Sequence, residues 1–111
     1  MGEFYGIDSD ALGADLAWIR AQLVAFRYRD QEVVDRLNSV SERAHAIASA
    51  RKSGQYDTWE ALRVNASRLA NALEIYRDKH AADAPFPFLK EKGDFGVVAE
   101  NAARELAAAA G

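Results

Sequence analysis

The sequence predicts an all-α protein organised around a long antiparallel helical hairpin. Apolar residues recur at spacings of three and four along residues 12–51, which is the period of one face of an α-helix. Residues 14–53 contain no glycine or proline, and a second stretch of the same period covers residues 59–80. With 111 residues, half of them hydrophobic, the chain is expected to form a single helical domain over residues 1–111.

The first predicted helix covers about residues 9–52 and follows a short N-terminal arm at residues 1–7. Its apolar seam is of coiled-coil type, and only Asp30 and the terminal Arg51 break it. One continuous helix of about 40 residues would be about 60 Å long. The seam consists of Leu12, Leu16, Ile19, Leu23, Phe26, Asp30, Val33, Leu37, Val40, Ala44, Ile47 and Arg51.

A break near residues 28–30 would instead fold the two halves of this helix into a compact four-helix bundle. The charge of Asp30 on the seam favours such a break. We favour the continuous helix, because helix breaks usually contain proline, glycine or a turn cluster, and residues 27–31 contain none of these.

The two halves of the long helix differ on the side away from the seam. The first half has a second apolar stripe there, whereas the second half has polar residues. The stripe consists of Ala14, Trp18, Ala21, Ala25 and Tyr28, and the same line continues as Glu32, Asp35, Ser39 and Glu42. The first half is therefore expected to make contacts on two sides.

The second predicted helix covers about residues 58–83 and pairs with the first. Asp57 with Glu60 three residues later has the outline of a capping box, and Gly54 suits the turn between the helices. The seam of this helix consists of Trp59, Leu62, Ala66, Leu69, Leu73, Tyr76 and His80. Two long seams joined by a short turn predict an antiparallel hairpin.

Residues 84–94 are predicted to be an extended strap or linker that lies on the hairpin. Pro85 and Pro87 are incompatible with regular helix, and the phenylalanines beside them favour docking on an apolar surface. A third helix is predicted over about residues 95–110, with Phe95 and Leu106 on its apolar face. It is expected to lie along the part of the first helix that the second helix is too short to cover.

These patterns favour a non-catalytic interaction or assembly protein that acts as a homo-oligomer or through a helical partner. Phage structural, adaptor and inhibitory proteins are compatible classes. The expected interaction residues lie in the uncovered part of the first helix and in the strap. They are Trp18, Tyr28, Leu16, Ile19, Leu23, Phe26, Phe86 and Phe88.

Composition argues against several other classes. The chain has no cysteine, which excludes thiolate chemistry and sulfur-ligated zinc, and no cofactor is expected. A formal charge of −3 gives no reason to expect nucleic acid as a partner. No signal peptide and no apolar run of about 20 residues is present, so we expect no membrane partner and a location in the cytoplasm or in an assembled particle.

The pattern closest to a metal site is Glu42 with His45, the spacing that recurs in ferritin-like di-iron bundles. The seam residues around this pair place it on the opposite, solvated side of the helix, so no metal site is predicted. A di-metal protein assembled from two such hairpins remains the alternative from a different functional class.

A helical hairpin of this length also resembles the small secreted proteins with a Trp-x-Gly turn. Residues 4–8, Phe-Tyr-Gly-Ile-Asp, suit the N-terminal style of that family. Alanine occupies position 61, two residues after Trp59, where the family has its glycine. The defining motif is therefore missing.

Overall fold

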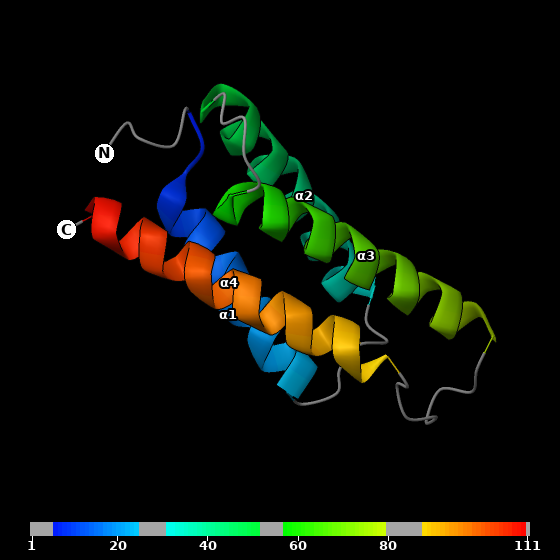
Figure 1. The fold of residues 1–111 in the computed structure, drawn as a ribbon. Coiled ribbons are helices and arrows are strands. Elements are labelled where there is room, and N and C mark those ends of the chain that lie inside the picture. Colours follow the sequence, from blue (N-terminus) through cyan, green and yellow to red (C-terminus); the bar gives the residue numbers. More distant parts are fainter. Residues whose placement is uncertain (1–5, 25–30, 52–56, 80–87, 111) are drawn as a thin grey trace.

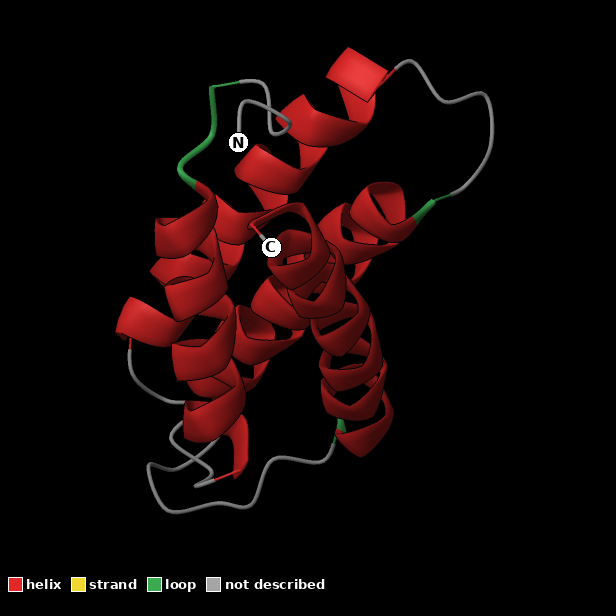
Figure 2. Ribbon diagram, turned by 90° about the vertical axis from the view of Figure 1, so that its left-hand side faces the viewer, coloured by secondary structure: helices red, strands yellow, loops and turns green. Residues whose placement is uncertain are grey.

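The computed structural model describes residues 6–24, 31–51, 57–79 and 88–110. These ranges form four α-helices and no strand (Figures 1 and 2), which confirms the all-α prediction. The helices are α1 (Ser9–Val24), α2 (Gln31–Arg51), α3 (Thr58–Lys79) and α4 (Leu89–Ala110).

The helices form a ring in which each packs against two neighbours: α1 on α2, α2 on α3, α3 on α4, and α4 back on α1. Side-chain contacts show in which direction neighbouring helices run relative to each other. Trp59 near the start of α3 bonds Glu105 near the end of α4, and Tyr76 near the end of α3 contacts Phe88 just before α4. These two helices are therefore antiparallel, and Figure 1 shows α1 and α4 running in opposite directions as well.

The core lies inside this ring and is supplied by the apolar face of every helix. None of the buried residues in the described ranges is polar or charged. The buried residues are Leu12, Leu16, Ile19 and Leu23 of α1; Val33, Val34, Leu37, Val40, Ala44 and Ile47 of α2; Trp59, Leu62, Ala66, Leu69, Ala70, Leu73 and Tyr76 of α3; and Phe95, Ala99, Ala102 and Leu106 of α4.

The predicted continuous helix over residues 9–52 is wrong. Asp15 bonds Arg36 and Arg43, which follow it by 21 and 28 positions. In one straight helix those residues would be about 32 and 42 Å from Asp15. The longest dimension of the molecule, 44 Å, is also shorter than the roughly 65 Å of such a helix.

The chain instead reverses direction between Val24 and Gln31, as in the alternative four-helix bundle. In an extended hairpin the leucine face of α1 would lie beyond the end of α3, whereas folding back buries it inside the chain's own core. Residues 25–30, among them Phe26, Tyr28 and Asp30, lie outside the described residues.

The predicted starts of the first and second helices are confirmed. Asp8 Oδ1 accepts the backbone N–H of Ala11 at 3.1 Å, and Asp57 Oδ1 accepts those of Trp59 and Glu60 at 3.1 and 3.0 Å. The Glu60 carboxylate bonds Arg63 of the following turn. Asp57 is thus the N-cap that the sequence predicts, with Glu60 engaged in a pair within its own helix.

The C-terminal helix begins earlier than predicted. Residues 89–94, assigned to the strap, are helical, and the Lys92 N–H donates to Phe88 O at 3.3 Å. No proline follows Pro87, so nothing in the backbone prevents helix from Leu89 onward. The rest of the strap and the predicted end of the second helix, residues 80–87, lie outside the described residues.

Candidate interaction surface on helices α1 and α4

Three of the predicted interaction residues belong to the core. Leu16, Ile19 and Leu23 expose 1%, 0% and 3% of their surface. They hold α1 in the bundle and are therefore not part of an exposed surface. Of the other predicted residues, Phe26, Tyr28 and Phe86 lie outside the described part of the chain.

Trp18 and Phe88 are half-buried and contact other helices of the same chain. The Arg36 guanidinium of α2 lies over the Trp18 ring, 4.2 Å from its centroid. Phe88 meets Tyr76 edge to face, with 6.5 Å between the ring centroids. The structure therefore uses both aromatic side chains in packing between its own helices.

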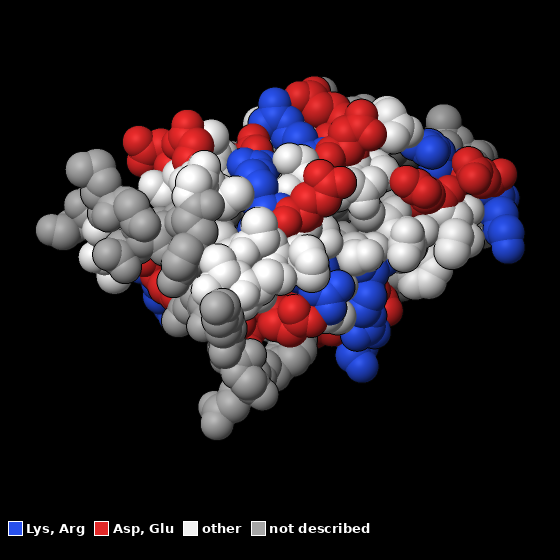
Figure 3. All heavy atoms as spheres, turned by 90° about the horizontal axis from the view of Figure 1, so that it is seen from above, with Lys and Arg blue, Asp and Glu red and all other residues white. Residues whose placement is uncertain are grey.

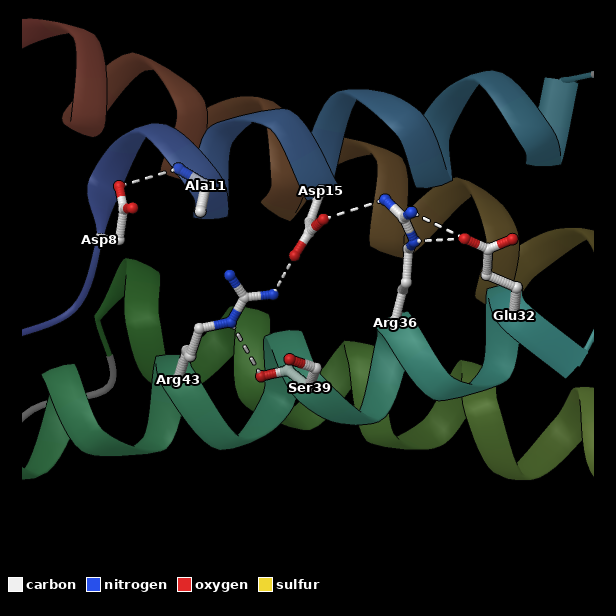
Figure 4. Close-up of polar contacts among 7 residues, drawn as sticks. All are labelled: Asp8, Ala11, Asp15, Glu32, Arg36, Ser39 and Arg43. Atoms are coloured by element: carbon white, nitrogen blue, oxygen red, sulfur yellow. Dashed lines mark hydrogen bonds and ion pairs between the residues drawn. The ribbon is translucent and has the colours of Figure 1, made fainter.

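A polar cluster fixes α1 on α2 (Figure 4) and consists of Asp15, Glu32, Arg36 and Arg43; we call it the Asp15 cluster. Arg36 donates to Asp15 Oδ1 at 3.1 Å and to Glu32 Oε2 at 2.7 Å. Arg43 donates to the other Asp15 oxygen. Two carboxylates face two guanidinium groups, so the cluster is balanced in charge.

Lys92 fixes the opposite end of α1 to α4. Its Nζ donates to the backbone oxygen of Leu23 at 3.2 Å, at the C-terminal end of α1. A helix end leaves its last carbonyl groups without intrahelical donors and carries partial negative charge, so an ammonium group is favourable there. Lys92 therefore ties the start of α4 to the end of α1.

Two further polar contacts involve α3. The buried Trp59 donates its indole N–H to Glu105 of α4 at 2.9 Å, which satisfies a polar atom inside the bundle. The hydrogen bond from Arg63 lowers the pKa of the Glu60 carboxyl below its ordinary value of 4.5, with smaller contributions from the charges of Arg63 and His45.

The outward side of α1 and α4 carries exposed apolar side chains that take no part in the polar contacts described above. Val24 of α1 and Val97 of α4 are 76% and 61% exposed, among the largest exposures of any described large hydrophobic residue. Both line one hollow between the two helices, together with Gly93 and Gly96. We call this the outer face; it consists of Ala14, Ala21, Val24, Gly93, Val97 and Ala107, all exposed.

The outer face continues toward the other end of the two helices. A second hollow there is lined by Gly13 and Ala14 of α1 and by Ala103 and Ala107 of α4. Arg20 and Glu100 also line the first hollow and form an ion pair there, with 3.9 Å between nitrogen and oxygen and with both side chains more than 40% exposed. Lys92 lines the first hollow as well and Asp10 lines the second, so the face combines apolar side chains with charges of both signs.

The sequence predicts part of this face. The second apolar stripe of the first helix contains Ala14 and Ala21, which are exposed as a second contact surface would require. Val24 and the residues of α4 were not predicted, because only the antiparallel packing of α4 on α1 brings Val97 beside Val24. The position of Val97 in a predicted helix gave no signal of that neighbour.

The described residues contain no group of three or more His, Cys, Asp or Glu side chains that could hold a metal ion. Glu42 and His45 are exposed on α2, on the solvated side that the sequence predicts. Acidic and basic side chains alternate over the face seen in Figure 3, without a basic stripe. None of the described helices is long and apolar enough to span a bilayer.

Comparison of the chain with protein-family models, curated proteins and solved structures found no match.

Proposed function

We propose that this chain is a non-catalytic helical assembly component that binds a second copy of itself through the outer face of α1 and α4. A helix of another protein is the alternative occupant. The observation that carries the proposal is the pairing of Val24 and Val97, two exposed valines on adjacent helices that frame one hollow.

Three features support this use of the face. Exposed apolar side chains that cluster around a hollow are typical of interaction sites, whereas single ones are ordinary on any surface. Small residues beside the valines let a partner helix approach closely. Arg20 and Glu100 give the face both signs of charge, which suits a twofold contact in which the same patch meets itself.

The test is the mass in solution of a double variant, Val24→Glu with Val97→Glu, at tens of micromolar. We expect the wild type to self-associate and the double variant to shift toward monomer with unchanged helix content. Ile75→Glu is the matched control, because Ile75 is a 53% exposed hydrophobic residue on α3, a helix that lines neither hollow of the outer face.

The outcome is read from sedimentation velocity together with circular dichroism. Equal association of the wild type and the double variant would show that the outer face is not the contact. A wild type that stays monomeric, and to which no synthetic amphipathic helix binds in a titration, would contradict the proposal as a whole.

A further inference from the structure

The outer face matches residues of α1 with residues of α4 at successive levels along the two helices. Arg20 is paired with Glu100, and Val24 shares the first hollow with Val97. Val24 follows Arg20 by four positions, and Val97 precedes Glu100 by three. Because α1 and α4 are antiparallel (Figure 1), both steps lead in the same direction along the face. One level therefore carries two opposite charges, and the next carries two valines.

The pair of Arg20 and Glu100 leaves both groups able to bind a further partner. Its separation of 3.9 Å is too long for a hydrogen bond, and both side chains are exposed to solvent. Glu100 uses one carboxylate oxygen to accept a hydrogen bond from Arg104 at 2.5 Å, but a carboxylate accepts several such bonds and a guanidinium donates several. An exposed pair of this kind contributes little to the stability of the fold. Its charges are therefore available for a contact outside the chain.

We infer that the outer face binds a second copy of this chain about a twofold axis that runs between α1 and α4 and parallel to them. This deepens the proposed function, on which it rests, by giving the orientation of the second copy and the residues that recognise it. A twofold rotation about this axis places α1 of each copy over α4 of the other, at the same level. Arg20 of each copy then meets Glu100 of the other, and Val24 of each copy meets Val97 of the other.

The charges of the face select this axis over one that crosses the two helices. A crossing axis at the level of the ion pair would place Arg20 over Arg20 and Glu100 over Glu100 of the second copy, which is unfavourable. The axis along the helices instead brings four charges of alternating sign together. Lys92 and Asp10 line opposite ends of the face on different helices, so neither meets its like across this axis. A helix of another protein would have to supply the same pattern of charges, whereas a second copy always carries it.

The test reverses one charge at a time and then mixes the variants. In a dimer of like chains, Arg20→Glu leaves only carboxylates at the four central positions, and Glu100→Arg leaves only guanidinium groups. Each variant alone is expected to raise the dimer dissociation constant on the order of tenfold. An equimolar mixture is expected to regain the dimer mass, because each chain then meets the opposite charge at both positions of the other. Sedimentation velocity of the variants, alone and mixed, measures this mass.

Arg104→Glu is the matched control for the charge reversal. It changes the net charge by as much as Arg20→Glu does and removes a partner of the same Glu100 carboxylate. Arg104 lines neither hollow of the outer face, however. The dissociation constant of this variant is expected to stay close to that of the wild type, and circular dichroism checks that every variant keeps its helix content.

Single cysteines test the direction of the axis, because the chain contains none of its own. Val24→Cys and Val97→Cys place their thiols opposite each other across the proposed axis. Oxidation of the two variants together, one of them tagged to change its size on a denaturing gel, is expected to link one variant to the other. Links mainly between two Val24→Cys chains would overturn the proposed axis.

Single charge variants that associate as strongly as the wild type, or a mixture no heavier than its components, would also overturn the inference. The proposed function would stand in that case if Val24→Glu with Val97→Glu still reduced the mass in solution. A failure of the proposed function looks different, because that double variant would then have the same mass as the wild type. The two ideas are thus told apart by which pair of residues controls association.

Discussion

Replacing Asp15 with alanine should loosen α1 from α2, because this carboxylate accepts hydrogen bonds from both Arg36 and Arg43. The exposed fractions of the three side chains are 24%, 34% and 19%, so these pairs are better shielded than ordinary surface pairs. A fully exposed ion pair contributes about 0 to 1 kcal/mol and a hydrogen bond to a charged group about 1.5 to 3.

Taking about 1 kcal/mol for each of the two bonds gives a loss of about 2 kcal/mol. Alanine recovers about 0.5 kcal/mol through its higher helix propensity. The expected net loss in the free energy of unfolding is therefore about 1.5 kcal/mol, which for a domain of this size lowers Tm by about 6 °C. Urea and thermal unfolding followed by circular dichroism measure both quantities.

Glu32→Ala is the matched control, because Glu32 bonds the same Arg36 but is 58% exposed and lies in the same helix. Such a pair contributes about 0.3 to 0.5 kcal/mol, which the helix propensity of alanine largely offsets. A double-mutant cycle of Asp15→Ala with Arg43→Ala should give a coupling of about 1 kcal/mol. Zero coupling, or equal losses for Asp15→Ala and Glu32→Ala, would refute the assignment of the Asp15 cluster as the contact that holds α1.

Four further predictions concern other positions. Glu105→Ala should lower the free energy of unfolding by about 2 kcal/mol, because it removes an acceptor of the buried Trp59 indole N–H. Glu105→Gln should lose much less, since the amide oxygen still accepts. Equal losses for the two variants in thermal unfolding would exclude the hydrogen bond as the cause. Gly96→Ala should stabilise the fold by about 1 kcal/mol, because alanine has the higher helix propensity and the added Cβ would have no atom within 4 Å. Gly6→Ala should destabilise the fold by about 1 kcal/mol, because φ at Gly6 is 86°, a left-handed conformation that is unfavourable for alanine. The lowered pKa of Glu60 implies stabilisation of the fold that is present above pH 4.5, the ordinary value, and is lost as pH falls through the lowered pKa. Glu60→Gln should therefore reduce stability at neutral pH and match the wild type in strong acid. An equal loss of stability at both pH values would contradict the ionised pair of Glu60 and Arg63.

The all-α class, the starts of α1 and α3 and the buried faces of the helices were predictable because the signals for them are local. Asp8 and Asp57 mark helix starts through hydrogen bonds to N–H groups two or three residues away. The seam residues from Leu12 to Leu23 and from Trp59 to Tyr76 are buried as their spacing predicts. A helix start and an apolar face depend on neighbours within one or two turns, and the sequence shows those neighbours directly.

The outer face was predictable only in part. Ala14 and Ala21 belong to a stripe that the sequence shows, but the hollow between Val24 and Val97 involves two residues 73 positions apart, as their numbers show. The antiparallel packing of α4 on α1 decides that they meet. Burial of Leu16, Ile19 and Leu23 likewise depends on which helices cover α1, so their spacing alone could not tell a core face from an interface.

By itself, the sequence determined that this protein is all-α, where α1 and α3 begin and which side of each helix is apolar. Only the tertiary structure decided that α1 folds back on α2 within one chain. The apolar seam runs in phase through both helices, so local spacing supports the extended and the folded arrangement equally. The choice depends on what is available to cover the leucine face of α1, and in this chain α2 and α4 cover it.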